Sequence, residues 1–292
     1  MFALAKKLRL VVACRSRNRP PFRGRERLLR ATDRFLRTFD RSCIETDIDG
    51  VRFRLDTEDL IDFRLAYCGA HQSDLIDYIS TRIPNAHFTI WDVGANVGSI
   101  SLLLAARHTN ISIHAFEPSP AIFARLAANL QRNPKLSSRI DLHQEALSNE
   151  SGNVRFFASS EPFNSGVGGL GPSLNREEAA VEVAAKCGDD LIESGGLPSP
   201  SLIKIDVEGF ELEVLQGLER FLRRSRDVEV VFENEPYRLR ERAFDKRVVV
   251  EHLVKLGFEI RQIAERGTTA PFNEISLDRS CDLVALKPGG GP

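Results

Sequence analysis

The chain has 292 residues, of which 42% are hydrophobic and 28% charged; these values suit a folded globular protein with one large α/β domain or two small ones. No apolar run approaches the roughly 18 residues of a membrane span, and the short apolar stretch near the start follows two lysines, so neither a transmembrane helix nor a secretory signal is expected. Five scattered cysteines without a C-x-x-C pair predict reduced thiols in a cytoplasmic protein, without a disulfide framework or a zinc site.

The positive charge is concentrated at the beginning of the chain. Residues 1–41 hold 13 Lys or Arg against three acidic residues, a balance of +10, so the remainder must carry −11 to give the net −1. Such a segment is typical of a basic arm for nucleic acid, an anionic membrane or an acidic substrate. We favour an amphipathic extension that packs on the domain, because apolar residues recur among the arginines at roughly helical spacing: Leu28, Leu29, Leu36 and Phe39.

Turn and capping signals divide the chain. Pro20–Pro21 predicts a break inside the basic segment, Asp49–Gly50 predicts a hairpin turn, and Ser73 is expected to open a short helix. The predicted parts are a basic N-terminal extension (1–43), a lead-in hairpin and helix (44–86), an α/β domain (87–288) and a disordered tail (289–292).

Strand and helix patterns alternate through the third part. Apolar positions at helical spacing follow the second and fourth strands, within 118–133 and 209–223. This alternation predicts a doubly wound, mostly parallel sheet with helices on both faces. The seven expected strands lie at 87–93, 111–117, 139–147, 201–207, 227–233, 258–263 and 282–287.

The first of these strands ends in a glycine-bearing turn. Asp92, Gly94, Asn96 and Gly98 form D-x-G-x-N-x-G at the position where a parallel sheet delivers its ligand. The glycines permit close approach of the backbone to a ligand. The spacing is neither that of a dinucleotide fingerprint nor that of a phosphate-binding P-loop. A nucleoside without phosphates fits better, and S-adenosylmethionine, with its ammonium and carboxylate, suits Asp92 and the open backbone groups.

A carboxylate follows at the end of the second strand. Glu117 stands 23 residues after Gly94, a spacing at which it can accept hydrogen bonds from both ribose hydroxyls. Alternatively, Glu117 stabilises the start of the next helix, with Pro118 in its first turn. The glycine turn upstream favours ribose binding.

Five stretches together resemble the FkbM family of S-adenosylmethionine-dependent methyltransferases: WDVGANVGSISLLLA, AFEPSPAIFARLAANL, EALSNESGNVRFF, NSGVGGL and LIKIDVEGFELEVLQGL. The resemblance runs from about Ile44 to Lys287. It implies a seven-stranded Rossmann-like methyltransferase sheet. It also implies O-methylation of a hydroxyl on a sugar, a polyketide or another small natural product.

The resemblance also implies roles for particular residues. Asp206 and Glu208 would lie beside the transferred methyl group as candidate catalytic residues. The family often has a glutamate before the first strand, where this chain has GAHQ with His71, which puts a ligand contact from that segment in doubt. The residues that would contact the cofactor are Asp92, Gly94, Ala95, Asn96, Gly98, Glu117, Pro118, Ala146, Leu147 and Asp206.

The end of the fourth strand carries the expected chemistry. Lys204, Asp206 and Glu208 alternate, so continued strand geometry would point all three to one side. A hydroxyl acceptor must lose its proton, and we expect Asp206 to be the base, with Glu208 as second candidate. Alternatively, Glu208, like Glu211, is a carboxylate favoured at a helix start.

Several further groups receive a structural interpretation. Asp206, Glu208 and Glu233 could bind a magnesium-like ion, but we favour unrelated carboxylates at the rim and assign no metal site. His143 lies in mid-strand and is expected to be structural. Asn234–Tyr237 (NEPY) resembles the motif of amino-group methyltransferases but lacks its first proline, so we regard it as unrelated.

The leading hypothesis is an O-methyltransferase for a small hydroxylated acceptor. One alternative is a nucleic-acid methyltransferase that uses 1–41 as a basic arm, which the scarcity of interleaved aromatics argues against. The other is a non-catalytic protein that binds S-adenosylmethionine or a partner. The acceptor site is expected to include the lead-in and the flexible, lid-like segment from Ser159 to Asn175.

Overall fold

The structure, a computed structural model, describes residues 2–17, 22–69, 71–157 and 180–288. Pro20–Pro21, the lid-like segment 159–175 and the tail 289–292 lie outside the described residues. Among the helices that the structure describes, none has the length and apolar character to cross a membrane.

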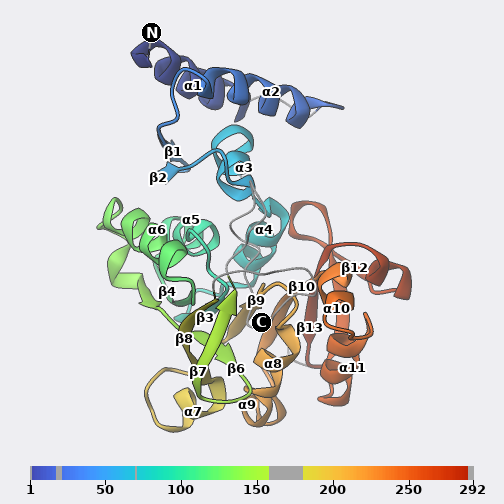
Figure 1. The fold of residues 1–292 in the computed structure, drawn as a ribbon. Helices are drawn as coiled ribbons and strands as arrows, with labels where there is room; N and C mark the ends of the chain where they lie inside the picture. The colour runs from blue at the N-terminus through green and yellow to red at the C-terminus, as the bar shows by residue number, and fades with distance from the viewer. Residues whose placement is uncertain (1, 18–21, 70, 158–179, 289–292) are drawn as a thin grey trace.

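An eight-stranded sheet forms the centre of the described molecule (Figure 1). Strands β10, β9, β3, β4 and β5 pair in parallel, β13 runs antiparallel between β10 and β11, and β12 extends the far edge. The mostly parallel prediction is confirmed, with β12 as an addition. The order is β12 (Thr269–Pro271), β11 (Glu259–Ile263), β13 (Cys281–Leu286), β10 (Glu229–Asn234), β9 (Leu202–Ile205), β3 (Phe88–Val93), β4 (Ile111–Phe116) and β5 (Ile140–His143).

Helices cover both faces of this sheet, as a doubly wound fold requires. Neighbouring residues of β3 point to opposite faces, so Ile90 joins one hydrophobic core and Trp91 the other. The core around Ile90 includes α4 (Ser73–Arg82), α5 (Ser99–Arg107) and α6 (Pro120–Gln131). The core around Trp91 includes α8 (Glu211–Gln216), α9 (Glu219–Arg224), α10 (Pro236–Glu241) and α11 (Val248–Lys255).

The strand expected at 139–147 is divided between two sheets. Its first part is β5, whereas β6 (Ala146–Ser148) pairs with β8 (Ala180–Cys187) beside β7 (Gly152–Phe157) in a separate three-stranded sheet. Ala146 and Leu147 therefore do not end a strand of the main sheet, which is a correction to the prediction. The remaining elements are α7 (Gly188–Glu193) and the short 3₁₀ helices η1 (Ser137–Arg139), η2 (Glu265–Gly267) and η3 (Glu274–Asp278).

The predicted lead-in hairpin is present as β1 (Ile44–Ile48) and β2 (Val51–Leu55). Asp49 and Gly50 both have positive φ, 51° and 81°, as the expected tight turn requires. The open edge of β2 is covered by side chains of the α6 region, because Asn129 and Asn133 accept hydrogen bonds from the backbone amides of Arg54 and Arg52. The hairpin is thereby fixed to the α/β domain.

The basic N-terminal segment forms two helices, α1 (Phe2–Arg17) and α2 (Arg25–Arg37), and α1 packs against α3 (Leu60–Cys68). Arg9 is fully buried; its guanidinium donates to Asp33 at 3.0 Å, to the Ser42 carbonyl at 2.7 Å and to Thr57 at 2.7 Å. A buried cation with complete partners holds the helices on the domain.

The prediction that the apolar residues of this segment face the domain was only partly right for α2. Leu29 and Leu36 are buried, but Leu28 is 59% exposed. The inward face of α2 also contains Asp33, because Arg9 requires a counter-charge there.

Replacing Asp33 with alanine should leave the Arg9 guanidinium buried without its main carboxylate. We expect the free energy of unfolding, measured by urea denaturation, to fall by about 3–5 kcal/mol. Glu26→Ala is the matched control, because Glu26 lies on the same helix in an exposed pair with Arg30 and should contribute less than about 1 kcal/mol. Equal losses in the two variants would contradict the structural role assigned to Arg9.

Candidate functional site

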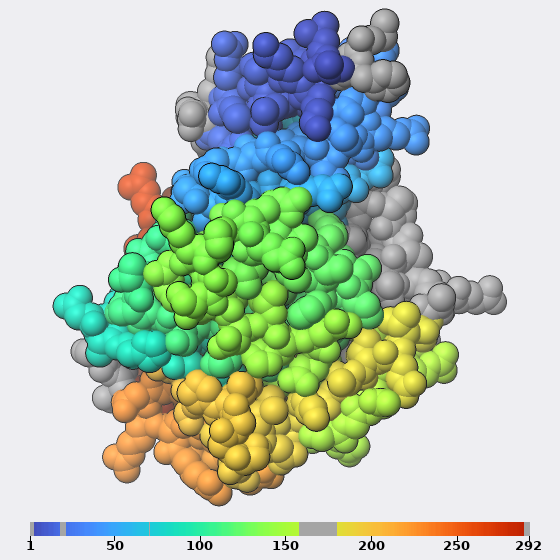
Figure 2. Space-filling model, turned by 90° about the vertical axis from the view of Figure 1, so that its left-hand side faces the viewer, coloured from blue at the N-terminus to red at the C-terminus, as the bar shows by residue number. Residues whose placement is uncertain are grey.

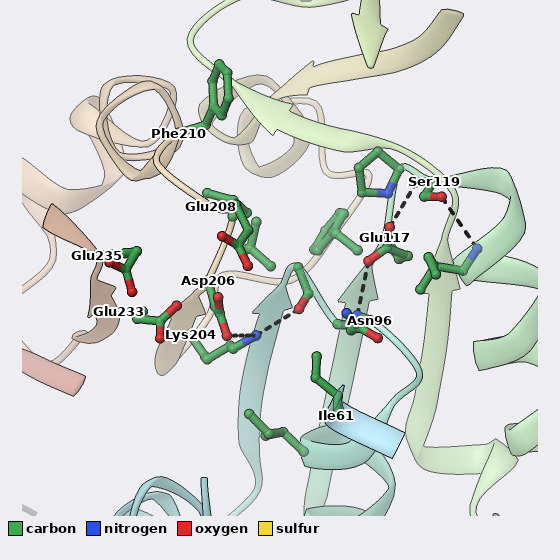
Figure 3. A pocket seen from close by; sticks show the side chains of 18 of the residues that line it. Ile61, Asn96, Glu117, Ser119, Lys204, Asp206, Glu208, Phe210, Glu233 and Glu235 are labelled. Carbon is green, nitrogen blue, oxygen red and sulfur yellow. Dashed lines mark hydrogen bonds and ion pairs between the residues drawn. The ribbon is translucent and has the colours of Figure 1, made fainter. Parts of the chain in front are cut away.

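A cavity of about 540 Å³ opens at the carboxyl ends of β3, β4, β9 and β10. Strands β3 and β9 are neighbours, yet the chain leaves them toward opposite edges of the sheet, and ligands of such folds bind at this crevice. The volume lies within the roughly 300–1,000 Å³ of small-molecule sites. Figure 3 shows Glu117, Asn96 and Ser119 on one side of the cavity, the Glu117 end. The other side, the acidic end, carries Asp206, Glu208, Glu233 and Glu235.

The glycine turn after β3 is shaped by packing within the protein. A Cβ on Gly94 would lie 1.9 Å from the carbonyl oxygen of Asp206, and φ of Gly94 is 79°. A Cβ on Gly98 would lie 2.5 Å from Leu126 of α6. These contacts give a packing reason for both glycines, since Gly94 admits the loop after β9 and Gly98 admits α6. The close approach of a ligand to this turn stays a prediction. Of these two glycines, Gly94 lines the cavity and Gly98 does not; Ala95 and Asn96 of the same turn also line it.

Glu117 is held at the end of β4 with its carboxylate largely buried. One oxygen accepts from the Asn96 amide at 3.1 Å and the other from the Ser119 amide at 2.9 Å. Burial raises the pKa of Glu117 to about 7, against the effect of these two hydrogen bonds. Each oxygen keeps a lone pair that can accept from a ligand hydroxyl. The following helix is capped by Ser119 and begins at Pro120, so Pro118, which lines the cavity, precedes its first turn.

Lys204 lies beneath the cavity and connects its two sides. Its ammonium donates to the Gly94 carbonyl at 2.8 Å and lies 3.1 Å from Asp92 Oδ1 and 3.7 Å from Asp206 Oδ2. Burial opposes the charge, but the two carboxylates outweigh it and raise the pKa of Lys204 to about 12. The cation therefore ties the turn after β3 to the loop after β9.

Asp206 and Glu233 form a pair of carboxyl groups joined by a hydrogen bond. The charge of Asp206, followed by burial, raises the pKa of Glu233 far above its usual value. Burial would also raise the pKa of Asp206, but the Lys204 charge and the hydrogen bonds from Glu233 and Gln72 keep it below its usual value. Within the pair, the negative charge is therefore favoured on Asp206 and protonation is favoured on Glu233.

Glu208 follows on the loop after β9, in the left-handed backbone region with φ of 55°. Burial, and next the charge of Asp206, raise its pKa to about 8, although Arg238 forms an ion pair with it at 3.0 Å. Strand β9 ends at Ile205, so Lys204, Asp206 and Glu208 do not continue as one strand. The end of β9 carries Lys204 and the loop after it carries Asp206 and Glu208, and all three line the cavity.

The lead-in, which was expected to help form the acceptor site, contributes the segment between α3 and α4. His71 and Gln72 line the cavity, and Gln72 Nε2 donates to Asp206 Oδ2 at 3.3 Å. Burial lowers the pKa of His71, so this imidazole is neutral. The departure at GAHQ had put a ligand contact from this segment in doubt, and the bond from Gln72 to Asp206 was not predicted. Ile61 and Arg64 of α3 complete this wall.

Some predicted residues lie away from the cavity wall. Asp92 is buried beneath it, where Ser101 donates to its carboxylate at 2.6 Å, so Asp92 supports the site through Lys204 and does not line it. His143 stacks on Phe116 at 4.6 Å and is structural, as expected. The amide of Asn234 donates to the Arg279 carbonyl and does not reach the cavity. By contrast, Ala146 and Leu147 do line it, from β6.

In the described ranges, 2–17, 22–69, 71–157 and 180–288, no cluster of three or more His, Cys, Asp or Glu side chains has an arrangement that could hold a metal ion. Two of the carboxyl groups considered for a metal have other partners: Glu233 is hydrogen-bonded to Asp206, and Glu208 forms an ion pair with Arg238.

Comparison with known proteins identifies relatives of this chain. The model of the Methyltransferase FkbM domain matches residues 92–263. Hexuronic acid methyltransferase AglP of Haloferax volcanii is 38% identical over 46% of this chain and 51% of its own length. The 31-O-demethyl-FK506 methyltransferase FkbM of Streptomyces tacrolimicus is 31% identical over 44% of this chain and 59% of its own. This chain therefore spans only about half the length of these relatives. A crystal structure of methyltransferase FkbM from Methylobacillus flagellatus KT is 15% identical, with a TM-score of 0.45, covering 97% of this chain and 58% of that one.

Gly94→Ala should separate the two loops that Lys204 joins, because the new methyl group meets the Asp206 carbonyl. Gly195→Ala is the matched control: Gly195 also has positive φ, 69°, but nothing lies within 4 Å of the added Cβ. We expect the control to lose about 1–2 kcal/mol of unfolding free energy from its backbone conformation alone. Gly94→Ala should lose about 1–3 kcal/mol more, by urea denaturation. Similar losses would show that the loops are not in the contact described.

Proposed function

The chain belongs to the FkbM methyltransferase family, and on that basis we propose that it transfers a methyl group from S-adenosylmethionine to a hydroxyl group of a small molecule. The observation that carries the proposal is the family match across the cavity, which includes the turn after β3, Glu117 and the loop after β9. The names of two relatives, a 31-O-demethyl-FK506 methyltransferase and a 2-O-methyltransferase from Sinorhizobium fredii, support oxygen as the acceptor atom.

The Glu117 end fits the nucleoside of S-adenosylmethionine. The carboxylate of Glu117 would accept both ribose hydroxyls through its remaining lone pairs, while Asn96 and Ser119 hold its orientation. Ala146, Leu147 and the buried ring of Phe156 would provide apolar contacts for the adenine.

The acidic end fits the other half of the cofactor and the acceptor. S-adenosylmethionine supplies an electrophilic methyl group on a positively charged sulfonium, and the negative charge of Asp206 favours a cation beside it. Alignment of the acceptor with that methyl group is the main task of the protein. Asp206 is the base of the proposal, since it is ionised, whereas Glu208, with a pKa of about 8, holds a proton at neutral pH.

We assign the acceptor to the sugars or other polyhydroxylated compounds. Gln72, His71 and the carboxyl groups of the acidic end offer hydrogen-bonding partners for several hydroxyls. The hexuronic acid named for the Haloferax relative makes uronic acids and their glycosides the first candidates. A nucleic-acid acceptor is not favoured, because the segment that this alternative would use as a basic arm is folded against α3 around the buried Arg9.

Calorimetric titration with S-adenosylmethionine tests the role of Glu117. Its pKa is raised to about 7, and hydroxyl donors favour the ionised form, so the pKa must fall on binding. The affinity for S-adenosylmethionine should therefore reach its full value above pH ~7. Below that pH it should fall, with a loss that approaches tenfold per pH unit. Glu117→Gln should lower affinity about tenfold or more at pH ~8. The substitution should also remove the part of the pH dependence of this affinity that comes from titration of Glu117.

Glu211→Gln is the matched control for this titration. Glu211 is buried with a pKa also raised to about 7 by burial, but it does not line the cavity. Its Oε1 accepts both backbone amides, from Val207 and Gly209, and a glutamine oxygen can replace it. An affinity that does not change with pH in the wild type, or that changes equally in both variants, would rule out ribose binding by Glu117.

Asp206→Asn should lower kcat by about 10²–10⁴-fold, because the acceptor hydroxyl loses its base. The readout is formation of S-adenosylhomocysteine with uronic acids and their glycosides at saturating cofactor, and calorimetry should show weaker but measurable cofactor binding. Asp227→Asn, the same change at an exposed position before β10, is the control. If Asp206→Asn keeps kcat within about threefold of the control, the proton has another acceptor.

A further inference from the structure

Helix α1 exposes its larger apolar side chains. Its inward face is small or polar, with Ala5, Arg9, Ala13 and Ser16 buried against the rest of the chain. Its outward face carries Leu4, Leu8 and Val11, which are 70%, 45% and 36% exposed and recur at the spacing of one helix face. These three side chains contribute little to the core, whereas Ala13 is part of it.

Helix α2 contributes residues of the same kind. It runs antiparallel to α1, because Arg9 bonds to Asp33 while Arg25 bonds to the Ser16 carbonyl. Leu28 is 59% exposed and Phe35 is 63% exposed. We refer to Leu4, Leu8, Val11, Leu28 and Phe35 as the N-terminal apolar residues. Both helices lie at one end of the molecule, where the blue part of Figure 2 forms a cap.

Basic side chains surround these residues. Segment 1–41 has a balance of +10, and exposed lysines and arginines occur on both helices: Lys6, Lys7, Arg15, Arg27 and Arg34. Exposed leucines beside lysines and arginines on a helix are typical of segments that lie in the interface of an anionic bilayer.

We propose that α1 and α2 form a docking surface for an anionic lipid bilayer. The exposed apolar side chains would enter the boundary between headgroups and acyl chains, and the basic ones would face the anionic headgroups. A second copy of this chain is disfavoured as occupant, because it would bring two segments of +10 together. Nucleic acid would use the basic residues but would leave Leu4 and Leu8 without a partner.

Docking in this way would place the cavity close to the lipid surface. Helix α3 packs against α1, and its residues Ile61 and Arg64 line the cavity. Helices α1 and α3 therefore lie between the proposed lipid contact and the acceptor side of the site.

Vesicle flotation with the full chain tests the proposal. Wild type should bind vesicles of phosphatidylcholine with phosphatidylserine, and bind vesicles of phosphatidylcholine alone at least about tenfold more weakly. Leu4→Ser/Leu8→Ser keeps every charge and removes two exposed leucines, so binding to the anionic vesicles should fall at least about tenfold. Since both side chains are exposed, thermal unfolding should not change.

Val254→Ser/Ile275→Ser is the matched control, because these aliphatic residues are 53% and 74% exposed but lie outside the N-terminal helices. It should bind as wild type does, within about twofold. The proposal is overturned if wild type does not prefer anionic vesicles, or if the leucine variant binds as well as the control. It is also overturned if light scattering shows a dimer that Leu4→Ser/Leu8→Ser dissociates, which would assign these residues to a second copy. None of these outcomes depends on methyl transfer.

Discussion

The ammonium of Lys204 is the interaction on which the cavity depends. A buried cation is tolerated only with partners on every side, and here they come from two different loops: the Gly94 carbonyl after β3 and the Asp206 carboxylate after β9. The carboxylate of Asp92, buried beneath the cavity, provides a second negative charge beside the ammonium. The two loops can approach closely because Gly94 lacks a side chain at the point where the Asp206 carbonyl lies. Charge and shape thus require the same arrangement.

This arrangement explains the unequal charges within one acidic site. Asp206 is nearest to Lys204 and remains ionised, and its charge in turn raises the pKa of Glu233 and contributes to the raised pKa of Glu208. The pKa values of three carboxyl groups close together therefore shift in different directions, because only Asp206 lies beside Lys204. In such a site the Asp206 carboxylate can accept a proton or lie beside a positive charge. The carboxyl groups of Glu233 and Glu208, when protonated, can donate hydrogen bonds.

The sequence predicted the features that depend on local patterns. Alternating strand and helix patterns placed six of the seven expected strands and the first part of the other, and spacing from the glycine turn placed Glu117 in the cavity wall. It misplaced features that depend on distant contacts. The strand predicted at 139–147 is divided after His143 because β6 pairs with β8, which lies nearly 40 residues later in the chain. The roles of Lys204 and Gln72, and the packing reason for Gly94, follow from contacts that neither periodicity nor motif spacing encodes.

The buried Arg9 also bears on how the chain may be divided. Its partners include Asp33 on α2, Ser42 before the hairpin and Thr57 after it, so α1 cannot leave without opening a polar interior above α3. Helix α3 supplies part of the cavity wall. The cavity wall thus extends beyond the family-matched residues 92–263. A chimera that replaces α1 alone would need to keep an arginine that reaches Asp33, Ser42 and Thr57.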